Sequence, residues 1–383
     1  MKKTLPIEAI KSEFIQSLKK HSTLILSAPP GAGKSTGLPL WLLEDAIISS
    51  QKIYLLQPRR IAAKNIACYL SNQVGEKVGG KVGYRLRNES KVSKSTVLEV
   101  ITEGILTQII QNDPELTGVG LVIIDEFHER SLNADLAFAL TRDVQLGLRD
   151  DLKLVIMSAT LATNALQKHL PEAKVLQSEG RSFPVEISYQ APKTGELWRN
   201  HLVKVIQTQL NANHKAILVF LPGVADIHFA TKALNQNLPD HVVLCPLFGG
   251  LTIEQQQKAM SPLSDNNKCK LVLSTNIAET SLTIEGVTLV IDSGLEKVAL
   301  YDEKSMTNRL KQQAISKASA TQRAGRAGRI EAGHCIRLYS REDFNRRQEH
   351  HTSEIQQADL LPLAIESARW GVTNFCELSL IHI

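Results

Sequence analysis

The chain has 383 residues, which is too many for one ordinary hydrophobic core and suits two domains with the start of a third. Hydrophobic residues make up 43% of it and charged residues 22%, as in soluble globular proteins, and no apolar run approaches the roughly 20 residues that span a bilayer. The net charge of +5 permits contact with phosphate backbones, but it also suits many metabolic enzymes, so charge alone does not identify a partner.

The first twenty residues and the cysteines indicate the compartment. Pro6, Glu8, Lys11 and Glu13 interrupt the apolar stretch that a secretory signal needs. The five cysteines are odd in number, widely separated and never in a Cys-x-x-Cys spacing, so neither a disulfide framework nor a zinc site is predicted. We therefore expect a cytoplasmic protein, without a membrane role, whose thiols are reduced and mostly buried.

Short apolar runs between helical stretches predict the strands of the first half. These runs lack polar–apolar alternation, which is typical of parallel strands covered by helices on both faces. Strands that alternate with helices also imply right-handed crossovers, so the first half is predicted to be a doubly wound α/β domain. The predicted strands are Thr23–Ser27, Ile53–Gln57, Val97–Ile101, Leu121–Ile124 and Leu154–Met157.

A second series of strands repeats this architecture without repeating the sequence. Between the two series, Glu179–Thr194 contains glycine, prolines and little helical periodicity, so we place the domain junction near Arg181. The predicted domains are residues 1–180 and residues 181–345. The strands of the second series are Ala216–Leu221, Val242–Pro246, Lys270–Ser274, Leu289–Asp292 and His334–Tyr339.

The tail of the chain, Ser353–Trp370, has a helical pattern with one apolar face. Nothing in the sequence offers this helix a packing partner, so we expect residues 346–383 to be the start of a truncated domain. The apolar face is predicted to consist of Ile355, Leu360, Leu361, Leu363, Ile365 and Ala368.

A glycine-rich segment lies between the strand Thr23–Ser27 and a probable helix, which is the setting of a phosphate-binding loop. In such a loop, backbone N–H groups surround the β-phosphate, Lys34 approaches the β and γ oxygens, and the Ser35 hydroxyl can bind Mg²⁺. Alanine replaces the usual first glycine and is small enough to fit. The segment is Ala28, Pro29, Pro30, Gly31, Ala32, Gly33, Lys34, Ser35 and Thr36.

Two carboxylates follow the strand Leu121–Ile124. An ionised Asp125 can hold Mg²⁺ through water, and Glu126 can orient and deprotonate the attacking water. Both carboxylates are predicted to belong to the metal site, with Ser35. Alone, such a pair is often a solvated strand end, and His128 could be an ordinary histidine. Because parallel sheets bind ligands at the carboxyl ends of their strands, we predict that these residues and the phosphate loop share one nucleotide site.

Arg326 and Arg329 lie one predicted helical turn apart and share a face. If the second domain docks on the first, this face can bring two guanidinium groups to the γ-phosphate and neutralise charge in the transition state. Hydrolysis would then depend on domain closure, which is what a motor requires. The alternative is a basic helix with a solvated face.

Seven segments stand in the order and spacing of one known family, over nearly the whole chain. They resemble those of the superfamily 2 helicases of the DEAH/DExH group, with DEFH in place of DEAH. The resemblance implies two tandem RecA-like domains with mostly parallel sheets, then the start of a C-terminal helical or winged-helix segment, with ATP and Mg²⁺ as cofactors. The segments are Ala28–Ser35, Gln57–Arg60, Thr102–Gly104, Asp125–His128, Ser158–Thr160, Ser274–Ile284 and Gln322–Arg329.

The resemblance also implies roles around the nucleotide. Arg326 and Arg329 are expected to be arginine fingers, with Gln322 near the attacking water and His128 in contact with the second domain. Tyr69 stands where many relatives stack an arginine on adenine, and its ring can still stack. Since no set of residues for reading the adenine edge is evident, we expect weak discrimination among nucleoside triphosphates. Relay roles are implied for Ser158 and Thr160, and nucleotide proximity for Ser281, Thr283 and Glu285, the last an aspartate in many relatives.

Strand contacts are likewise implied, and their amide, hydroxyl and guanidinium groups suit a phosphate backbone held without sequence reading. Arg87 matches a further backbone contact, although a solvated loop arginine is the alternative. Leu295–Lys317 is expected to contain a β-hairpin, which in relatives helps separate strands and otherwise is a charged surface hairpin. The remaining implied contacts are Arg59, Arg60, Thr102, Gly104, Thr275 and Asn276.

The leading interpretation is a monomeric ATPase with 3′-to-5′ helicase activity on single-stranded RNA or DNA. One alternative is a translocase or remodelling ATPase that does not unwind duplexes. Another is a nucleic-acid clamp with an idle ATPase, against which the intact Lys34, Glu126 and Arg326 argue. No reader of a 2′-hydroxyl is evident, so RNA and DNA both stay open.

Overall fold

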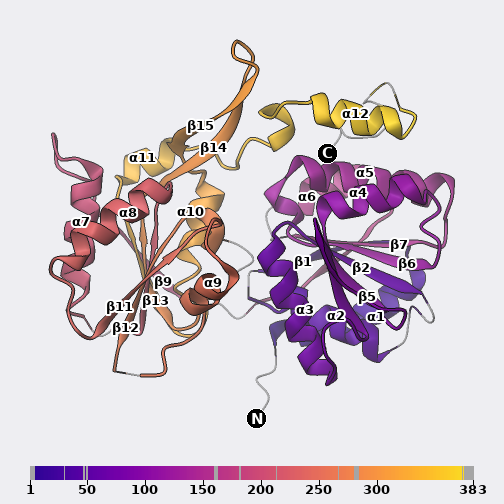
Figure 1. Cartoon of the computed structure of the whole chain (residues 1–383), viewed down its shortest axis with the longest axis horizontal. Helices are drawn as coiled ribbons and strands as arrows, with labels where there is room; N and C mark the ends of the chain where they lie inside the picture. Colours follow the sequence, from indigo (N-terminus) through magenta and orange to yellow (C-terminus); the bar gives the residue numbers. More distant parts are fainter. Residues whose placement is uncertain are drawn as a thin grey trace. The chain divides into compact units, whose positions relative to one another are not determined.

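The computed structural model describes residues 5–29, 31–45, 48, 51–158, 163–180, 183–212, 214–265, 267–279, 284–372 and 374. It divides into two compact units, which we call unit 1 and unit 2 and describe separately (Figure 1). Unit 1 consists of Met1–Gly180 and Ser353–Ile383, and unit 2 consists of Arg181–Thr352. Both contain a mostly or fully parallel sheet flanked by helices, which confirms the predicted fold class.

The described part of unit 1 contains one sheet of eight strands in the order β4-β3-β5-β2-β6-β7-β1-β8. All its pairings are parallel except β3 with β4. The five predicted strands are present, whereas β3, β4 and β8 were missed because polar or small residues interrupt their apolar character. The strands are β1 (Thr23–Ser27), β2 (Lys52–Gln57), β3 (Val82–Leu86), β4 (Glu89–Lys91), β5 (Leu98–Thr102), β6 (Val119–Ile124), β7 (Lys153–Ser158) and β8 (Lys174–Gln177).

Helices cover both faces of this sheet, as the continuous apolar runs predicted. Successive residues of a strand point to opposite faces, so Ile123 packs with the α1–α3 side and Ile124 with the α4–α5 side. Each such buried side chain contributes about 1.5–3 kcal/mol to folding. The helices are η1 (Pro6–Ile10), α1 (Lys11–Lys20), α2 (Lys34–Glu44), α3 (Arg60–Val74), α4 (Glu103–Asn112), η2 (Phe127–Glu129), α5 (Leu132–Gly147), α6 (Thr163–His169), η5 (Glu354–Gln356) and α12 (Leu361–Arg369).

The tail helix α12 packs on α4 and α5, so the prediction that it has no partner is wrong. Leu363 is 2% exposed and belongs to the core on the α4–α5 side. The Trp370 indole donates a 2.6 Å hydrogen bond to Asp143 of α5. Only part of the predicted apolar face is buried, because Leu361 and Ile365 are 63% and 58% exposed.

The described part of unit 2 has a parallel sheet of six strands in the order β11-β12-β10-β13-β16-β9. The predicted strands are present, but β9 was missed because it lies at the sheet edge and is partly exposed, without a continuous apolar run. The strands are β9 (Val185–Tyr189), β10 (Ala216–Phe220), β11 (Val242–Leu247), β12 (Cys269–Ser274), β13 (Val287–Asp292) and β16 (Gly333–Arg337), and the helices are α7 (Trp198–Gln209), α8 (Val224–Asn235), α9 (Ile253–Met260), η4 (Asn276–Ala278), α10 (Lys317–Ala324) and α11 (Arg341–Arg346).

The expected β-hairpin is confirmed. Strands β14 (Leu295–Asp302) and β15 (Thr307–Ala314) pair antiparallel, and the hairpin extends away from the sheet of unit 2 (Figure 1). Most side chains of β15 are exposed. The hairpin therefore offers polar and charged side chains on both strands.

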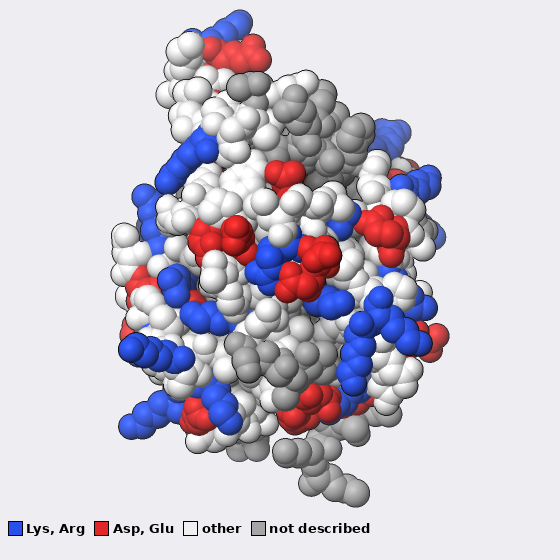
Figure 2. Space-filling model, turned by 90° about the vertical axis from the view of Figure 1, so that its right-hand side faces the viewer, with Lys and Arg blue, Asp and Glu red and all other residues white. Residues whose placement is uncertain are grey.

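Charge is spread over the surface in the view of Figure 2, where basic and acidic side chains are interspersed. Surface ion pairs of the protein include Lys11 with Glu44 at 2.9 Å and Arg149 with Asp151 at 2.6 Å. Within the part of the chain that the structure describes, no helix has the length and apolar character needed to cross a membrane. Four cysteines in that part are free thiols, and Cys376 lies outside the described residues.

Candidate nucleotide and strand sites

The parallel sheet of unit 1 brings the predicted motifs to one edge. The register pairs Ser27 with Ser158 and Gln57 with Thr102, so β1, β7, β2 and β5 end at a similar level. Asp125 follows the end of β6, which lies between β2 and β7. The phosphate loop, the carboxylates and the predicted strand contacts of unit 1 therefore share the carboxyl edge, where α/β sheets bind ligands.

Lys34 is the first residue of α2 and is 6% exposed. Its ammonium donates to the Ala28 carbonyl at 2.6 Å and to the Ser158 carbonyl at 3.3 Å. These carbonyls belong to the start of the loop and to the end of β7. Lys34 is thus held at the mouth of the loop, where phosphate oxygens can replace weaker carbonyl acceptors.

The backbone of the phosphate loop requires glycine at Gly33, whose φ is 96°. A Cβ atom here would also lie 2.8 Å from Leu5 Cδ1. The N-terminal segment supports the loop further, since the Ile7 N–H donates to the Ala32 carbonyl at 3.1 Å. No local pattern in the sequence indicates this contribution of Leu5 and Ile7, because their partners Gly33 and Ala32 lie far along the chain.

Asp125 is 2% exposed, and both of its carboxylate oxygens accept hydrogen bonds. One of its oxygens accepts from the Ser35 hydroxyl and from the Gln57 amide, both at 2.5 Å, and the other accepts from the Glu126 N–H at 2.9 Å. Burial, helped by the charge of Glu126, raises the pKa of Asp125 to about 6. The contact between Ser35 and Asp125 joins the phosphate loop to the two carboxylates, and we predicted that both lie at the carboxyl edge of the sheet.

Glu126 adopts φ 52°, a left-handed conformation that costs roughly 1–3 kcal/mol outside glycine. Phe127 anchors this turn in the core, with its ring centroid 5.3 Å from that of Phe138. His128 Nδ1 lies 3.6 Å from a Glu126 oxygen. The turn thus holds the Glu126 carboxylate beside Asp125 with an imidazole next to it.

The predicted strand contacts of unit 1 lie at or just after the ends of β2, β3 and β5. Arg59 is half-buried and lies 3.5 Å from Glu129, while Arg60 and Arg87 are exposed and joined by a 3.4 Å bond from Arg60 to the Arg87 carbonyl. Thr102 is the N-cap of α4. Gly104, in its first turn, is exposed. These groups are accessible to a phosphate backbone.

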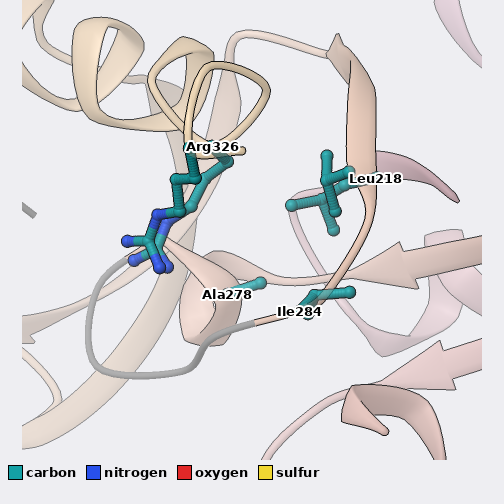
Figure 3. A pocket seen from close by; sticks show the side chains of 6 residues that line it. Leu218, Ala278, Ile284 and Arg326 are labelled. Carbon is teal, nitrogen blue, oxygen red and sulfur yellow. The ribbon is translucent and has the colours of Figure 1, made fainter. Parts of the chain in front are cut away.

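The predicted arginine fingers of unit 2 lie together, although not on one helix. Helix α10 ends at Ala324, so Arg326 and Arg329 come from the turns that follow it, and the predicted shared helical face is wrong. Both arginines nevertheless line the same small pocket with Ala278 and Ile284 (Figure 3). Arg326 is 4% exposed and donates from Nε to the Glu279 carbonyl at 2.9 Å.

Arg323, which sequence reasoning did not single out, is fully buried in unit 2. It donates to Glu279 and Asp292, each at 2.9 Å, and its guanidinium lies 4.9 Å from the centre of the Phe220 ring. Gln322, its neighbour in α10, is partly exposed. The arginine-rich motif therefore combines a structural arginine with two arginines at a pocket.

The remaining predicted site residues lie on several elements of the two units. Tyr69 lies on α3 and is 40% exposed, and Ser158 is buried at the end of β7. Thr275 is the N-cap of η4, in which Asn276 is exposed. Glu285 is exposed just before β13. Four predicted residues lie outside the described part of the chain, namely Pro30, Thr160, Ser281 and Thr283.

Comparison with known families agrees with the motifs. Residues 8–168 match the DEAD/DEAH box helicase family, and residues 199–331 match the helicase conserved C-terminal domain. The chain is 49% identical over 376 residues to the ATP-dependent RNA helicase HrpB of Escherichia coli, covering 98% of this chain and 46% of that protein. The chain belongs to the DEAD/DEAH box helicases.

The chain is also similar to HrpA proteins. The chain is 39% identical over 382 residues to the ATP-dependent RNA helicase HrpA of Borreliella burgdorferi, with 98% of this chain and 46% of the relative covered. It therefore spans less than half the length of both relatives.

Two solved structures of this helicase family confirm the fold. A crystal structure of the E. coli DEAH/RHA helicase HrpB has a TM-score of 0.92, with 49% identity, and covers 97% of this chain and 47% of that chain. A crystal structure of the E. coli DExH-box NTPase HrpB has a TM-score of 0.89, with 46% identity, and covers 100% of this chain and 48% of that chain. The two α/β domains are therefore tandem RecA-like helicase domains.

Proposed function

We propose that this chain is the motor of an ATP-dependent helicase, which couples ATP hydrolysis to movement along a nucleic-acid strand. The observation that carries this proposal is the contact between Ser35 and Asp125, 90 residues apart in sequence, beside the buried Lys34. A phosphate loop joined to a carboxylate at the carboxyl edge of a parallel sheet suits phosphoryl transfer.

The residues around Asp125 fit a magnesium ion. Mg²⁺ prefers oxygen ligands and keeps several waters, and here a hydroxyl and a carboxylate already lie 2.5 Å apart. We therefore propose that Ser35, Asp125 and Glu126 hold Mg²⁺ with ATP, where the ion would neutralise phosphate charge. Glu126 orients the attacking water and accepts its proton, and Lys34 holds the β and γ oxygens.

We further propose that Arg326 and Arg329 stabilise the charge of the transition state, with Gln322 near the attacking water. Their support is the pocket in unit 2 that both arginines line. His128, Ser158 and Thr160 would connect the nucleotide state to movement. Tyr69, Ser281, Thr283 and Glu285 complete the proposed nucleotide site, with weak discrimination among nucleoside triphosphates.

RNA is the proposed strand, because HrpB and HrpA are both named as RNA helicases. The exposed positions of Arg60, Arg87, Gly104 and Asn276 support backbone contact. Arg59, Thr102 and Thr275 are proposed to join them. The 3′-to-5′ direction, duplex unwinding and a role of the β14–β15 hairpin in it are also proposals, and the alternative is a translocase that does not unwind.

We also propose the domain limits 1–180, 181–345 and 346–383, a monomeric state and a cytoplasmic location.

The test is ATP hydrolysis with single-stranded RNA and single-stranded DNA of equal length, followed by unwinding of duplexes with a 3′ overhang. We expect hydrolysis to rise on addition of RNA and a 3′-tailed duplex to open. Stimulation without unwinding would favour the translocase. Hydrolysis that neither strand stimulates would refute the motor and indicate a clamp.

A further inference from the structure

Gln57 connects the two proposed sites of unit 1. It is the last residue of β2, and its side chain is completely buried. Its amide nitrogen donates to Asp125 Oδ2 at 2.5 Å, on the same oxygen that accepts from Ser35. The side chain of Gln57 thus helps to fix the orientation of the carboxylate that is proposed to hold Mg²⁺.

The other end of the same amide has an unused acceptor. Among the residues that the structure describes, Gln57 Oε1 is buried and has no hydrogen-bond partner. A buried carbonyl oxygen without a donor is unfavourable, and such oxygens are normally paired with protein or water. Since Mg²⁺ keeps several waters when it binds near carboxylates, a hydrating water can supply the missing donor. An amide is suited to both tasks, because it donates to the carboxylate and accepts from water.

The residues that follow Gln57 are the proposed strand contacts. Pro58 fixes its own φ, so the connection from Gln57 to Arg59 is short and stiff. Arg59 lies 3.5 Å from Glu129, in the turn after Asp125 and Glu126. A phosphate bound at Arg59 or Arg60 therefore pulls on a short, stiff stretch of backbone. That stretch begins at Gln57, whose side chain contacts Asp125.

We propose that Gln57 is a positioning residue through which strand binding at Arg59 and Arg60 sets the orientation of Asp125 and of a hydrating water of Mg²⁺. This inference rests on the proposed function and adds a route of regulation within unit 1. This route differs from the stimulation of ATP hydrolysis by Arg326 and Arg329, because those two arginines belong to unit 2.

Gln57→Met tests the proposal, because methionine keeps the length of glutamine and removes both hydrogen-bonding groups. The matched control is Gln256→Met. Gln256 is also completely buried and has an unpaired Oε1 among the described residues, but it lies in unit 2 and donates to the Leu251 carbonyl at 3.1 Å. Thermal unfolding shows whether each variant is folded.

The first measurement is the affinity for a fluorescent, non-hydrolysable ATP analogue, with Mg²⁺ and with EDTA. In Gln57→Met we expect the gain in affinity on adding Mg²⁺ to fall about tenfold or more, the size of one hydrogen bond to a charged group. Affinity in EDTA should stay within twofold of the unmodified chain, which also shows that the site is folded. An unchanged gain would overturn the role of Gln57 toward Mg²⁺.

The second measurement is the ratio of ATP hydrolysis with and without single-stranded RNA. This ratio should fall at least fivefold in Gln57→Met and stay normal in Gln256→Met, while RNA affinity without nucleotide is unchanged. Gln57→Glu should show the same loss, because it places a second carboxylate beside Asp125. If the unmodified chain is stimulated and Gln57→Met is stimulated equally, only this inference is refuted. If RNA does not stimulate the unmodified chain, the proposed function fails, and this inference with it.

Discussion

Replacing Arg323 by methionine should destabilise unit 2 severely. The substitution removes the only charge of this side chain while Asp292, which is 0% exposed, and Glu279, which is 9% exposed, stay buried. Both carboxylates lie 2.9 Å from the guanidinium, whose pKa they raise against the opposing effect of burial. Asp292 would keep its bonds from the Gly294 N–H and the Tyr339 hydroxyl, which are too few to compensate a buried charge.

Breaking a buried ion pair from one side costs about 3–5 kcal/mol. Since a unit of this size loses about 2–4 °C of Tm per kcal/mol, we expect unit 2 to unfold roughly 6–20 °C lower. Hydrogen exchange read by mass spectrometry separates the units, because peptides from β10 and β13 report on unit 2 and peptides from β1 and β7 on unit 1. Protection of β10 and β13 should fall at least a hundredfold, since each 1.4 kcal/mol is a factor of ten.

Arg309→Met is the matched control, because Arg309 is a hairpin arginine with its side chain 68% exposed and 3.2 Å from Asp302. Exposed ion pairs contribute about 0–1 kcal/mol, so little change is expected. If Arg323→Met reduced the protection of β10 and β13 less than fivefold, the argument that this arginine compensates two buried carboxylates would be wrong.

Four substitutions in the nucleotide machinery and its surroundings give further predictions. Glu126→Gln should preserve ATP binding and lower steady-state phosphate release about 10²–10⁴-fold, because the proposed base is lost. Arg326→Ala should leave ATP affinity nearly unchanged and lower turnover about 10³-fold or more, since an arginine finger acts on the transition state. Gly33→Ala should weaken ATP binding in a fluorescence titration, because the new Cβ meets Leu5 at 2.8 Å and φ is 96°. Burial raises the pKa of Glu103 from 4.5 to about 7, so its contribution to the stability of unit 1 is full below pH 4.5 and is lost as pH rises to 7. Glu103→Gln should therefore flatten this pH dependence and stabilise unit 1 at pH 8, measured by denaturation at pH 5 and pH 8.

Each of these predictions has a contradicting result. Substantial hydrolysis by Glu126→Gln would show that another group is the base, and normal turnover in Arg326→Ala would exclude a finger. Exposed residues supply controls, namely Glu115→Gln and Arg341→Ala, which should behave as the unmodified chain. Unchanged nucleotide affinity in Gly33→Ala would show that the loop tolerates the shift of Leu5. If the stability of unit 1 depended on pH equally in Glu103→Gln and in the unmodified chain, groups other than Glu103 would be responsible for that dependence.

The sequence by itself determined the features that depend on neighbouring residues. Apolar runs identified the central strands, because a strand covered on both faces needs apolar side chains at every position. The segment from Ala28 to Thr36 identified the phosphate loop, since all the groups expected to bind phosphate lie within nine consecutive residues. The order of the strands placed Asp125 near Ser35, and the 2.5 Å contact confirms that expectation.

The tertiary structure alone decided which residues support these motifs. Gln57 and Arg323 belong to recognisable segments, but only the fold shows that one holds Asp125 and that the other compensates two buried carboxylates. The short edge strand β9 and the partners of α12 were missed for a related reason. An edge strand and a docked helix are stabilised by pairing and packing with segments distant in sequence, and such long-range contacts leave no local pattern of polarity.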